Sequence, residues 1–270
     1  MQMPLWPSLG RFCPAPASRA VHRIRARAAR WIRPRRIGRI AGLVLVALWL
    51  ALPGPAPAAA EPDAATQAGP ITLLAFGDSL TAGYGLPVED SFPARLETAL
   101  REKGIEARVL NAGVSGDTTA GGLARLDWSL AQKPDAVILE LGANDGLRGF
   151  EPETTHDNLG AILEKLAGRD IAVLLTGMRA PPNYGEEYAI AFNGVYERLS
   201  RAFDVLYYPF FLEGVAGDPA LNQDDGIHPN RAGVDVIVSN ILPHVRRLIA
   251  HVRAADATAP KPAAAADAGN

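Results

Sequence analysis

The sequence predicts an α/β protein built on a parallel sheet with helices on both faces. Two observations lead to this prediction: five apolar runs have the length of buried strands, and segments with apolar residues at helical spacing separate them. Strands that alternate with helices in this way pair in parallel and are covered on both sides. Ligands of such sheets bind beyond the carboxyl ends of the strands. We therefore expect the polar residues that follow these strands to meet at one edge.

Each expected strand is a short apolar run that stops at turn residues. The first, residues 71–76, ends before Gly77, and the third, residues 136–141, ends before Gly142. The last run is the shortest. The expected strands are residues 71–76, 107–111, 136–141, 171–176 and 205–207.

The expected helices carry apolar residues on one face. In residues 91–103, Phe92, Leu96 and Leu100 recur at helical spacing, and Gly104 follows the last turn. The closing helix is expected to begin at a proline, a residue suited to a first turn. The other expected helices are residues 118–130, 154–168, 187–203 and 229–252.

The first 60 residues predict a signal for export. They hold ten Arg and no Lys, Asp or Glu, and the basic part is followed by an apolar run at residues 40–52 and then by small residues. This order is typical of a secretory signal peptide cleaved after a small residue, here near Ala60. A retained membrane anchor is the alternative, but a spanning helix needs roughly 20 apolar residues. Arg35-Arg36 leaves twin-arginine export open.

Removal of residues 1–60 would leave an acidic protein in the periplasm or outside the cell. Its 17 Lys and Arg against 29 Asp and Glu give a net charge of −12, which argues against nucleic acid as a partner. The sole cysteine, Cys13, would leave with the signal, so disulfides and cysteine metal sites are excluded. We expect a lead-in at residues 61–69, one monomeric domain without a membrane anchor at residues 70–253, and a disordered tail at residues 254–270.

Ser79 is the candidate nucleophile. It follows the first expected strand on a strand-to-helix turn, where Gly77 permits a tight bend. The N-terminus of a following helix would direct backbone N–H groups toward a reacting centre. Alone, the pattern is as typical of a turn serine that caps a helix. The other polar segments decide between the two interpretations.

Asp225 and His228 are the candidate orienting carboxylate and base. They lie three residues apart across a glycine turn, and Pro229 keeps the backbone of His228 out of the helical region. Asp225 can then accept a hydrogen bond from one ring nitrogen and leave the other nitrogen for the serine. The alternative is a turn with a capping histidine. The remaining histidines after residue 60 lack such a turn: His156, His244 and His251.

Gly116 and Asn144 are the candidate oxyanion donors. The N–H of Gly116 can approach a substrate closely because the residue has no side chain, and Asn144 offers a side-chain NH₂. Either one alone would be an ordinary loop residue. Together with the serine, the histidine and the aspartate, they complete the groups required for acyl transfer through a serine.

At these positions the sequence resembles the SGNH, or GDSL, hydrolase family, in its bacterial thioesterase I, lysophospholipase L1 and arylesterase branch. The resemblance covers about residues 70–250 and includes segments 144–150, 182–185 and 224–230. It departs at Ala143, where a second glycine often stands; we expect little effect unless that backbone needs a positive φ. The four residues that name the family are matched by Ser79, Gly116, Asn144 and His228, with Asp225 at the Asp-x-x-His position.

The resemblance implies a flavodoxin-like three-layer α/β/α sandwich with a five-stranded parallel sheet. It implies a serine esterase or thioesterase with Ser79 as nucleophile, His228 as base and Asp225 as its partner. The backbone N–H groups of Ser79 and Gly116 and the side chain of Asn144 would form the oxyanion hole. No cofactor or metal is implied, and the sequence has no phosphate loop, dinucleotide fingerprint, His-Glu-x-x-His or Gly-x-Ser-x-Gly segment.

The expected substrate is a small acyl ester, thioester or lysophospholipid. Apolar residues that follow strands could line an open groove for its acyl chain, although ordinary packing would explain each of them: Leu147, Phe150, Pro181, Pro182, Tyr184, Phe210 and Phe211. Residues 178–186 and the stretch after Asn144 are the candidate mobile rim.

Two other functions remain open at this point. A carbohydrate O-deacetylase of the same family would prefer acetyl groups and would need a polar groove. A non-catalytic binding protein on the same scaffold would have lost an active residue, and none is missing here.

Overall fold

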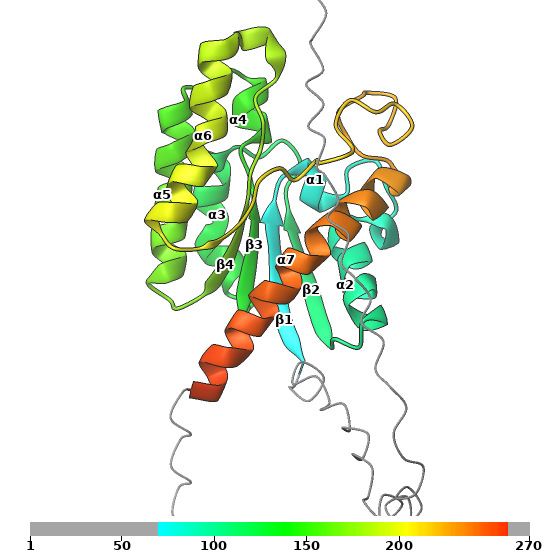
Figure 1. Cartoon of the computed structure of the whole chain (residues 1–270), viewed down its shortest axis with the longest axis vertical. Coiled ribbons are helices and arrows are strands. Elements are labelled where there is room, and N and C mark those ends of the chain that lie inside the picture. The colour runs from blue at the N-terminus through cyan, green and yellow to red at the C-terminus, as the bar shows by residue number, and fades with distance from the viewer. Residues whose placement is uncertain (1–69, 259–270) are drawn as a thin grey trace, which may run out of the picture. The chain divides into compact units, whose positions relative to one another are not determined.

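A five-stranded sheet forms the centre of the computed structural model, which describes residues 70–258 (Figure 1). All neighbouring strands are parallel, and their order is β2-β1-β3-β4-β5. The predicted five-stranded parallel sheet is therefore confirmed. The strands are β1 (Ile71–Gly77), β2 (Ala107–Gly113), β3 (Ala136–Glu140), β4 (Ala172–Thr176) and β5 (Leu206–Tyr208).

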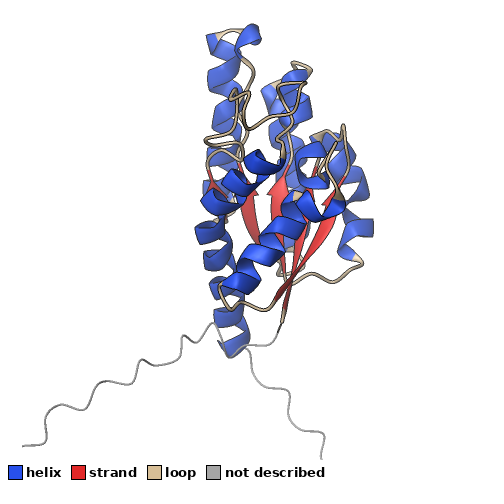
Figure 2. Ribbon diagram, turned by 90° about the vertical axis from the view of Figure 1, so that its right-hand side faces the viewer, coloured by secondary structure: helices blue, strands red, loops and turns tan. Residues whose placement is uncertain are grey.

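Helices cover both faces of the sheet, as predicted for continuous apolar strands. Every residue of β3 is buried, and β1 is buried except at Thr72, as expected for strands that lie between two layers. Figure 2 shows the strands between the two helix layers. One layer holds α2 (Phe92–Glu102) and α7 (Arg231–Thr258); the other holds α3 (Thr119–Leu130), α5 (Pro152–Ala167) and α6 (Glu186–Ala202).

Single-turn elements follow several strands, where the sequence predicted loops. One turn contains too few residues to show a helical repeat, so periodicity could not reveal these elements. Two of them, α1 and α4, directly follow the central strands β1 and β3. The single-turn elements are α1 (Ser79–Ala82), η2 (Val88–Asp90), α4 (Ala143–Leu147) and η3 (Pro182–Tyr184).

Both predicted limits of the closing helix are wrong. Pro229 lies before the helix because it pairs with Asn222 in an isolated bridge, and α7 begins at Arg231. At the other end the helix continues to Thr258, so the predicted tail does not begin at Ala254. Residues 254–258 are rich in alanine, the best helix former, and they extend a helix already anchored by packing. The predicted signal, the lead-in and the rest of the tail lie outside the described residues.

None of the helices within residues 70–258 has the length and apolar character needed to span a membrane. Their apolar residues instead pack against the sheet: α2, for example, buries Phe92, Leu96 and Leu100 completely, the three positions predicted from its spacing. The two layers thus complete the predicted three-layer α/β/α sandwich.

Candidate active site

The polar segments meet at the carboxyl ends of β1 and β3. The chain passes from β1 to β2 on one side and later returns to place β3 on the other side, so the strand order reverses between these two strands. Such a reversal leaves a crevice at the sheet edge in open α/β folds. The short helix α1 lies at the upper end of β1 in Figure 1, and α4 follows β3.

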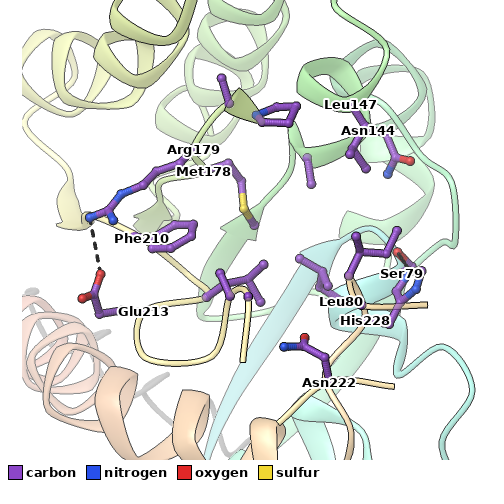
Figure 3. Close-up of a pocket in the computed structure, with 18 of the residues that line it drawn as sticks. Ser79, Leu80, Asn144, Leu147, Met178, Arg179, Phe210, Glu213, Asn222 and His228 are labelled. Carbon is purple, nitrogen blue, oxygen red and sulfur yellow. Dashed lines mark hydrogen bonds and ion pairs between the residues drawn. The ribbon is translucent and has the colours of Figure 1, made fainter. Parts of the chain in front are cut away.

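Ser79, His228 and Asp225 form a continuous hydrogen-bonded chain. His228 Nε2 lies 2.9 Å from Ser79 Oγ, and His228 Nδ1 lies 2.6 Å from Asp225 Oδ2. Figure 3 shows the serine and the histidine side by side at the cavity. Residues 149 positions apart in the chain are thus in contact, as the sequence predicted. This order is the geometry needed to transfer a proton from the serine hydroxyl.

The serine is held by the turn that joins β1 to α1. Asp78 caps the helix, since its Oδ1 accepts the Leu80 N–H at 3.0 Å. Gly77 was predicted to permit a tight bend, but its φ is not positive. The structure gives a different reason for the glycine: a Cβ there would lie 2.2 Å from Thr81 Oγ1 and 2.4 Å from Glu140 Oε2.

Asp225 holds His228 through both its backbone and its ring. Its Oδ1 accepts the backbone N–H groups of Ile227 and His228, each at 3.0 Å, across the left-handed residue Gly226. The hydrogen bonds from the backbone and ring of His228, followed by that from Ile227, lower the pKa of Asp225 to about 2. The carboxylate therefore stays ionised beside the imidazole.

Two further residues support the histidine and were missed by sequence reasoning. The ring of Tyr84 packs against the ring of His228, with centroids 4.6 Å apart. Gln223 Nε2 donates to the carbonyl oxygens of Tyr84 at 2.7 Å and Pro229 at 2.9 Å, which joins the two loops. These contacts link residues 139 positions apart, and no local sequence pattern predicts them.

Asn144 occupies the first turn of α4 and faces the cavity. Its Nδ2 donates to Asp78 Oδ2 at 3.1 Å, which uses one of the two N–H bonds and leaves the second for a ligand. The left-handed position in this segment is Gly142, with φ +111°, where a Cβ would lie 2.1 Å from Tyr196 Oη. Ala143 has no positive φ, so the departure from the family pattern introduces no backbone strain, as expected.

Gly116 lies in an exposed turn after β2 and does not line the main cavity. Its φ is +82°, and a Cβ would find no atom within 4 Å. Backbone conformation rather than space therefore favours glycine here. Arg148 Nη2 donates to the Gly116 carbonyl oxygen at 3.0 Å, so the end of α4 fixes this turn.

Two fully buried carboxyl groups lie directly beneath the site. Burial raises the pKa of Asp78 to about 6. Burial, and then the nearby charge of Asp78, raises the pKa of Glu140 well above its usual range. The Thr81 hydroxyl donates to Glu140 Oε2 at 2.8 Å. The sequence places Glu140 only within the third expected strand, residues 136–141, and gives it no role in the site.

A cavity of about 610 Å³ opens beside Ser79 and His228, a size suited to a small ligand. Much of its lining is apolar, including Leu80, Leu147, Met178, Pro181, Pro182 and Phe210. On the side opposite the serine and histidine, Arg179 pairs with Glu213 at 3.4 Å (Figure 3). The guanidinium of Arg179 also lies 4.3 Å from the ring centre of Phe210.

The predicted groove is only partly correct. Leu147 and Pro182 line the cavity, whereas Phe150 and Tyr184 do not. The Tyr184 hydroxyl donates to the Leu147 carbonyl oxygen at 3.0 Å, and the Tyr184 ring packs on Tyr188. Tyr184 therefore supports the end of α4 instead of lining the cavity. Phe211, also expected in the groove, is completely buried against Phe92 in the core.

One side-chain cluster among the described residues has the spacing of metal ligands: Glu153, His156 and Asp157 on α5. These residues are exposed or half-buried, and they do not line the cavity.

Residues 75–236 match the family described as GDSL-like Lipase/Acylhydrolase. The chain is 44% identical over 184 residues to Esterase TesA of Pseudomonas aeruginosa, covering 68% of this chain and 92% of that protein. It is 43% identical over 181 residues to thioesterase 1/protease 1/lysophospholipase L1 of Escherichia coli, covering 67% and 86%. The crystal structure of AlinE4, an SGNH-hydrolase family esterase, is 51% identical, with 67% and 97% coverage and a TM-score of 0.57.

The chain therefore belongs to the GDSL-like lipase/acylhydrolase family, and it is a serine ester hydrolase of the SGNH type. The class predicted from the ordered polar segments is confirmed. The alternative from the sequence, a non-catalytic binding protein on this scaffold, is therefore not the best interpretation.

Proposed function

We propose that the protein hydrolyses acyl esters and thioesters through an acyl-enzyme formed on Ser79. The single observation that best supports this is the hydrogen-bonded chain from Asp225 through His228 to Ser79, with the serine lining a cavity of about 610 Å³. A serine is nucleophilic only when a base takes its proton, and the base acts only when its ring is correctly oriented. Both conditions are met by these three side chains.

In the first half of the reaction, His228 Nε2 takes the proton from Ser79 Oγ as the oxygen attacks the substrate carbonyl carbon. The tetrahedral intermediate collapses, the bond to the alcohol or thiol breaks, and His228 returns the proton to the leaving group. In the second half, His228 takes a proton from water, which attacks the acyl-enzyme and releases the acid and free Ser79. Asp225 stabilises the imidazolium throughout and does not itself take the proton.

The developing oxyanion is stabilised by the free N–H of the Asn144 side chain and by the backbone N–H groups of Ser79 and Gly116. The hydrogen bond from Asn144 to Asp78 holds the amide in place before substrate binds. Pre-oriented donors need no reorganisation as charge develops, and each typically contributes ~10²–10³ in turnover.

The apolar lining of the cavity favours an acyl chain as the part of the substrate that is bound. Leu147, Met178 and Phe210 offer hydrocarbon surface next to the serine, and the named relatives are an esterase and a thioesterase/lysophospholipase. We therefore include aryl esters, acyl thioesters and lysophospholipids among the substrates. A carbohydrate O-deacetylase is not favoured, because its acetylated sugar would require a more polar groove.

Hydrolysis of p-nitrophenyl esters from acetyl to palmitoyl, of acyl-CoA thioesters and of lysophosphatidylcholine tests the proposal. Ser79→Ala should abolish turnover on all of them. Ser239→Ala, an exposed serine on α7, is the matched control and should leave turnover unchanged. Full activity of the Ser79 variant would refute the mechanism, and activity confined to acetyl esters of sugars would favour the deacetylase.

We also propose that the protein is exported and monomeric. The support is the composition of residues 1–60, with its basic segment, short apolar run and small residues near Ala60. The intact mass of the exported protein should correspond to cleavage near Ala60. A mass that includes residues 1–60 would instead indicate a retained anchor, and light scattering of the same sample reports its oligomeric state.

A further inference from the structure

Glu140 is a buried titratable residue that the proposed reaction does not use. It ends β3 directly beside Gly77 of β1, and both Glu140 and Asp78 are completely inaccessible. Its Oε2 accepts the Thr81 hydroxyl at 2.8 Å and the Asp78 N–H at 3.3 Å. Its Oε1 is also buried but receives no hydrogen from any N–H or O–H donor within the described residues.

In contrast to Glu140, Asp78 accepts a hydrogen bond at each of its two carboxyl oxygens. Its Oδ1 accepts the Leu80 N–H at 3.0 Å, and its Oδ2 accepts an N–H of Asn144 at 3.1 Å. Both donors favour the ionised carboxylate. The Asp78 N–H donates to Glu140 Oε2 at 3.3 Å, so the two buried carboxyl groups are neighbours, and a hydrogen bond between them requires one of them to carry a proton.

Two buried carboxylates in contact cannot both remain charged without a large desolvation and repulsion cost. The nearby charged or titratable groups do not remove this cost. Among residues 70–258, no Lys or Arg hydrogen bonds to either carboxyl group; Arg125 of α3 instead binds the Gly77 carbonyl oxygen and Asp117. The other titratable groups near the pair are His228, which acts on Asp78, and the Tyr196 phenol, which itself lies near Asp145.

We propose that Glu140 is a positioning residue for the oxyanion donor: it stays protonated in the folded protein and donates its Oε1–H to the Asp78 carboxylate, which in turn orients the Asn144 side chain. The proton on Oε1 gives the orphaned atom a partner, while Oε2 continues to accept from Thr81 and the Asp78 backbone. The raised pKa values of both groups agree with one shared proton. Only the expected effect on turnover rests on the proposed function.

Glutamine can reproduce every one of these contacts. In Glu140→Gln the amide NH₂ would donate to Asp78, and the amide oxygen would accept from Thr81 and the Asp78 N–H. In Glu140→Leu, the Asp78 carboxylate and the Thr81 hydroxyl would each lose a partner. Glu164→Gln, at an exposed position on α5, is the matched control for removal of a glutamate.

Infrared spectroscopy of the resting protein tests the protonation state directly. The wild type should show the carbonyl stretch of a protonated carboxylic acid, shifted in heavy water. This band should disappear in Glu140→Gln and persist in Glu164→Gln. An infrared spectrum with no band that depends on residue 140 would overturn the proposal.

Stability measured against pH gives a second, independent reading. The unfolded chain releases the Glu140 proton above its ordinary pKa of 4.5, whereas the folded protein retains it, so stability falls as pH rises from that point toward the folded pKa. Relative to Glu140→Gln, the unfolding equilibrium constant of the wild type should increase by up to about tenfold per pH unit in this range. A difference that does not change with pH would show that Glu140 is ionised.

Kinetics test the positioning role. Glu140→Gln should keep kcat within about threefold of wild type. Glu140→Leu should lower kcat by about tenfold to a hundredfold at nearly constant KM. This loss is smaller than the loss expected when an oxyanion donor is removed entirely. Unchanged kcat in Glu140→Leu would refute positioning. If that variant does not fold, the infrared and pH measurements on Glu140→Gln still decide the protonation state. Neither needs turnover, so a failure of the Ser79 mechanism would be recognised separately.

Discussion

Replacement of Asn144 by alanine should separate catalysis from stability, because this side chain makes two different contacts. One N–H donates to the buried Asp78 carboxylate at 3.1 Å, and the other is left for a ligand on a side chain that lines the cavity together with Ser79. Alanine removes both N–H groups without disturbing the helical backbone of α4, since it is a strong helix former.

The two losses have different sizes and different signatures. Loss of the oxyanion donor should lower kcat by ~10²–10³, about 3 kcal/mol of transition-state stabilisation. KM should change little, because the missing hydrogen bond forms only as charge develops on the substrate oxygen. Loss of a donor to a buried carboxylate should lower the free energy of unfolding by about 1–3 kcal/mol.

Steady-state kinetics on a p-nitrophenyl ester and urea unfolding of the same samples measure the two effects. Wild type and Ser239→Ala provide the reference values. A kcat within about threefold of wild type would refute the assignment of Asn144 as an oxyanion donor. A large rise in KM at constant kcat would indicate a role in ground-state binding instead.

Three further predictions concern the residues around the site. Gly77→Ala places a Cβ 2.2 Å from Thr81 Oγ1, so urea unfolding should show a loss of about 1–3 kcal/mol. Arg148→Ala removes the 3.0 Å bond to the Gly116 carbonyl oxygen; kcat should fall by about tenfold with unchanged unfolding, and an unchanged kcat would show that the turn needs no such support. Asp225 has a pKa lowered to about 2, so its contact with His228 stabilises the fold above pH 3.8 and loses that effect as pH falls toward 2. The difference in unfolding free energy between wild type and Asp225→Asn should therefore vanish in acid. A difference that stays constant with pH would contradict this prediction.

The sheet and the convergence of the site could be predicted because they depend on patterns that repeat along the chain. Five apolar runs separated by helical repeats define a parallel sheet, and parallel strands bring the residues after them to one edge. The sequence therefore predicts that Ser79, Asn144 and His228 approach one another. The structure places all three at the cavity.

The contacts that orient those residues could not be predicted in the same way. Glu140 contacts Asp78 only because β3 lies beside β1. Tyr84 packs against His228 although the two residues are far apart in the sequence. Tyr184 is expected in the groove, but its hydroxyl donates to the carbonyl oxygen of Leu147 and the residue does not line the cavity. Such choices depend on three-dimensional neighbours, which neither composition nor periodicity contains.

The alignment of β1 with β3 has a consequence for how the enzyme becomes active. Gly77 stands opposite Glu140, and a slip of one residue would turn the glutamate to the other face of the sheet. These two strands are separated in sequence by α1, η2, α2, β2 and α3, and pairings between such distant segments form slowly. During refolding, ester hydrolysis should consequently return only after the two central strands have joined, however early the individual helices form.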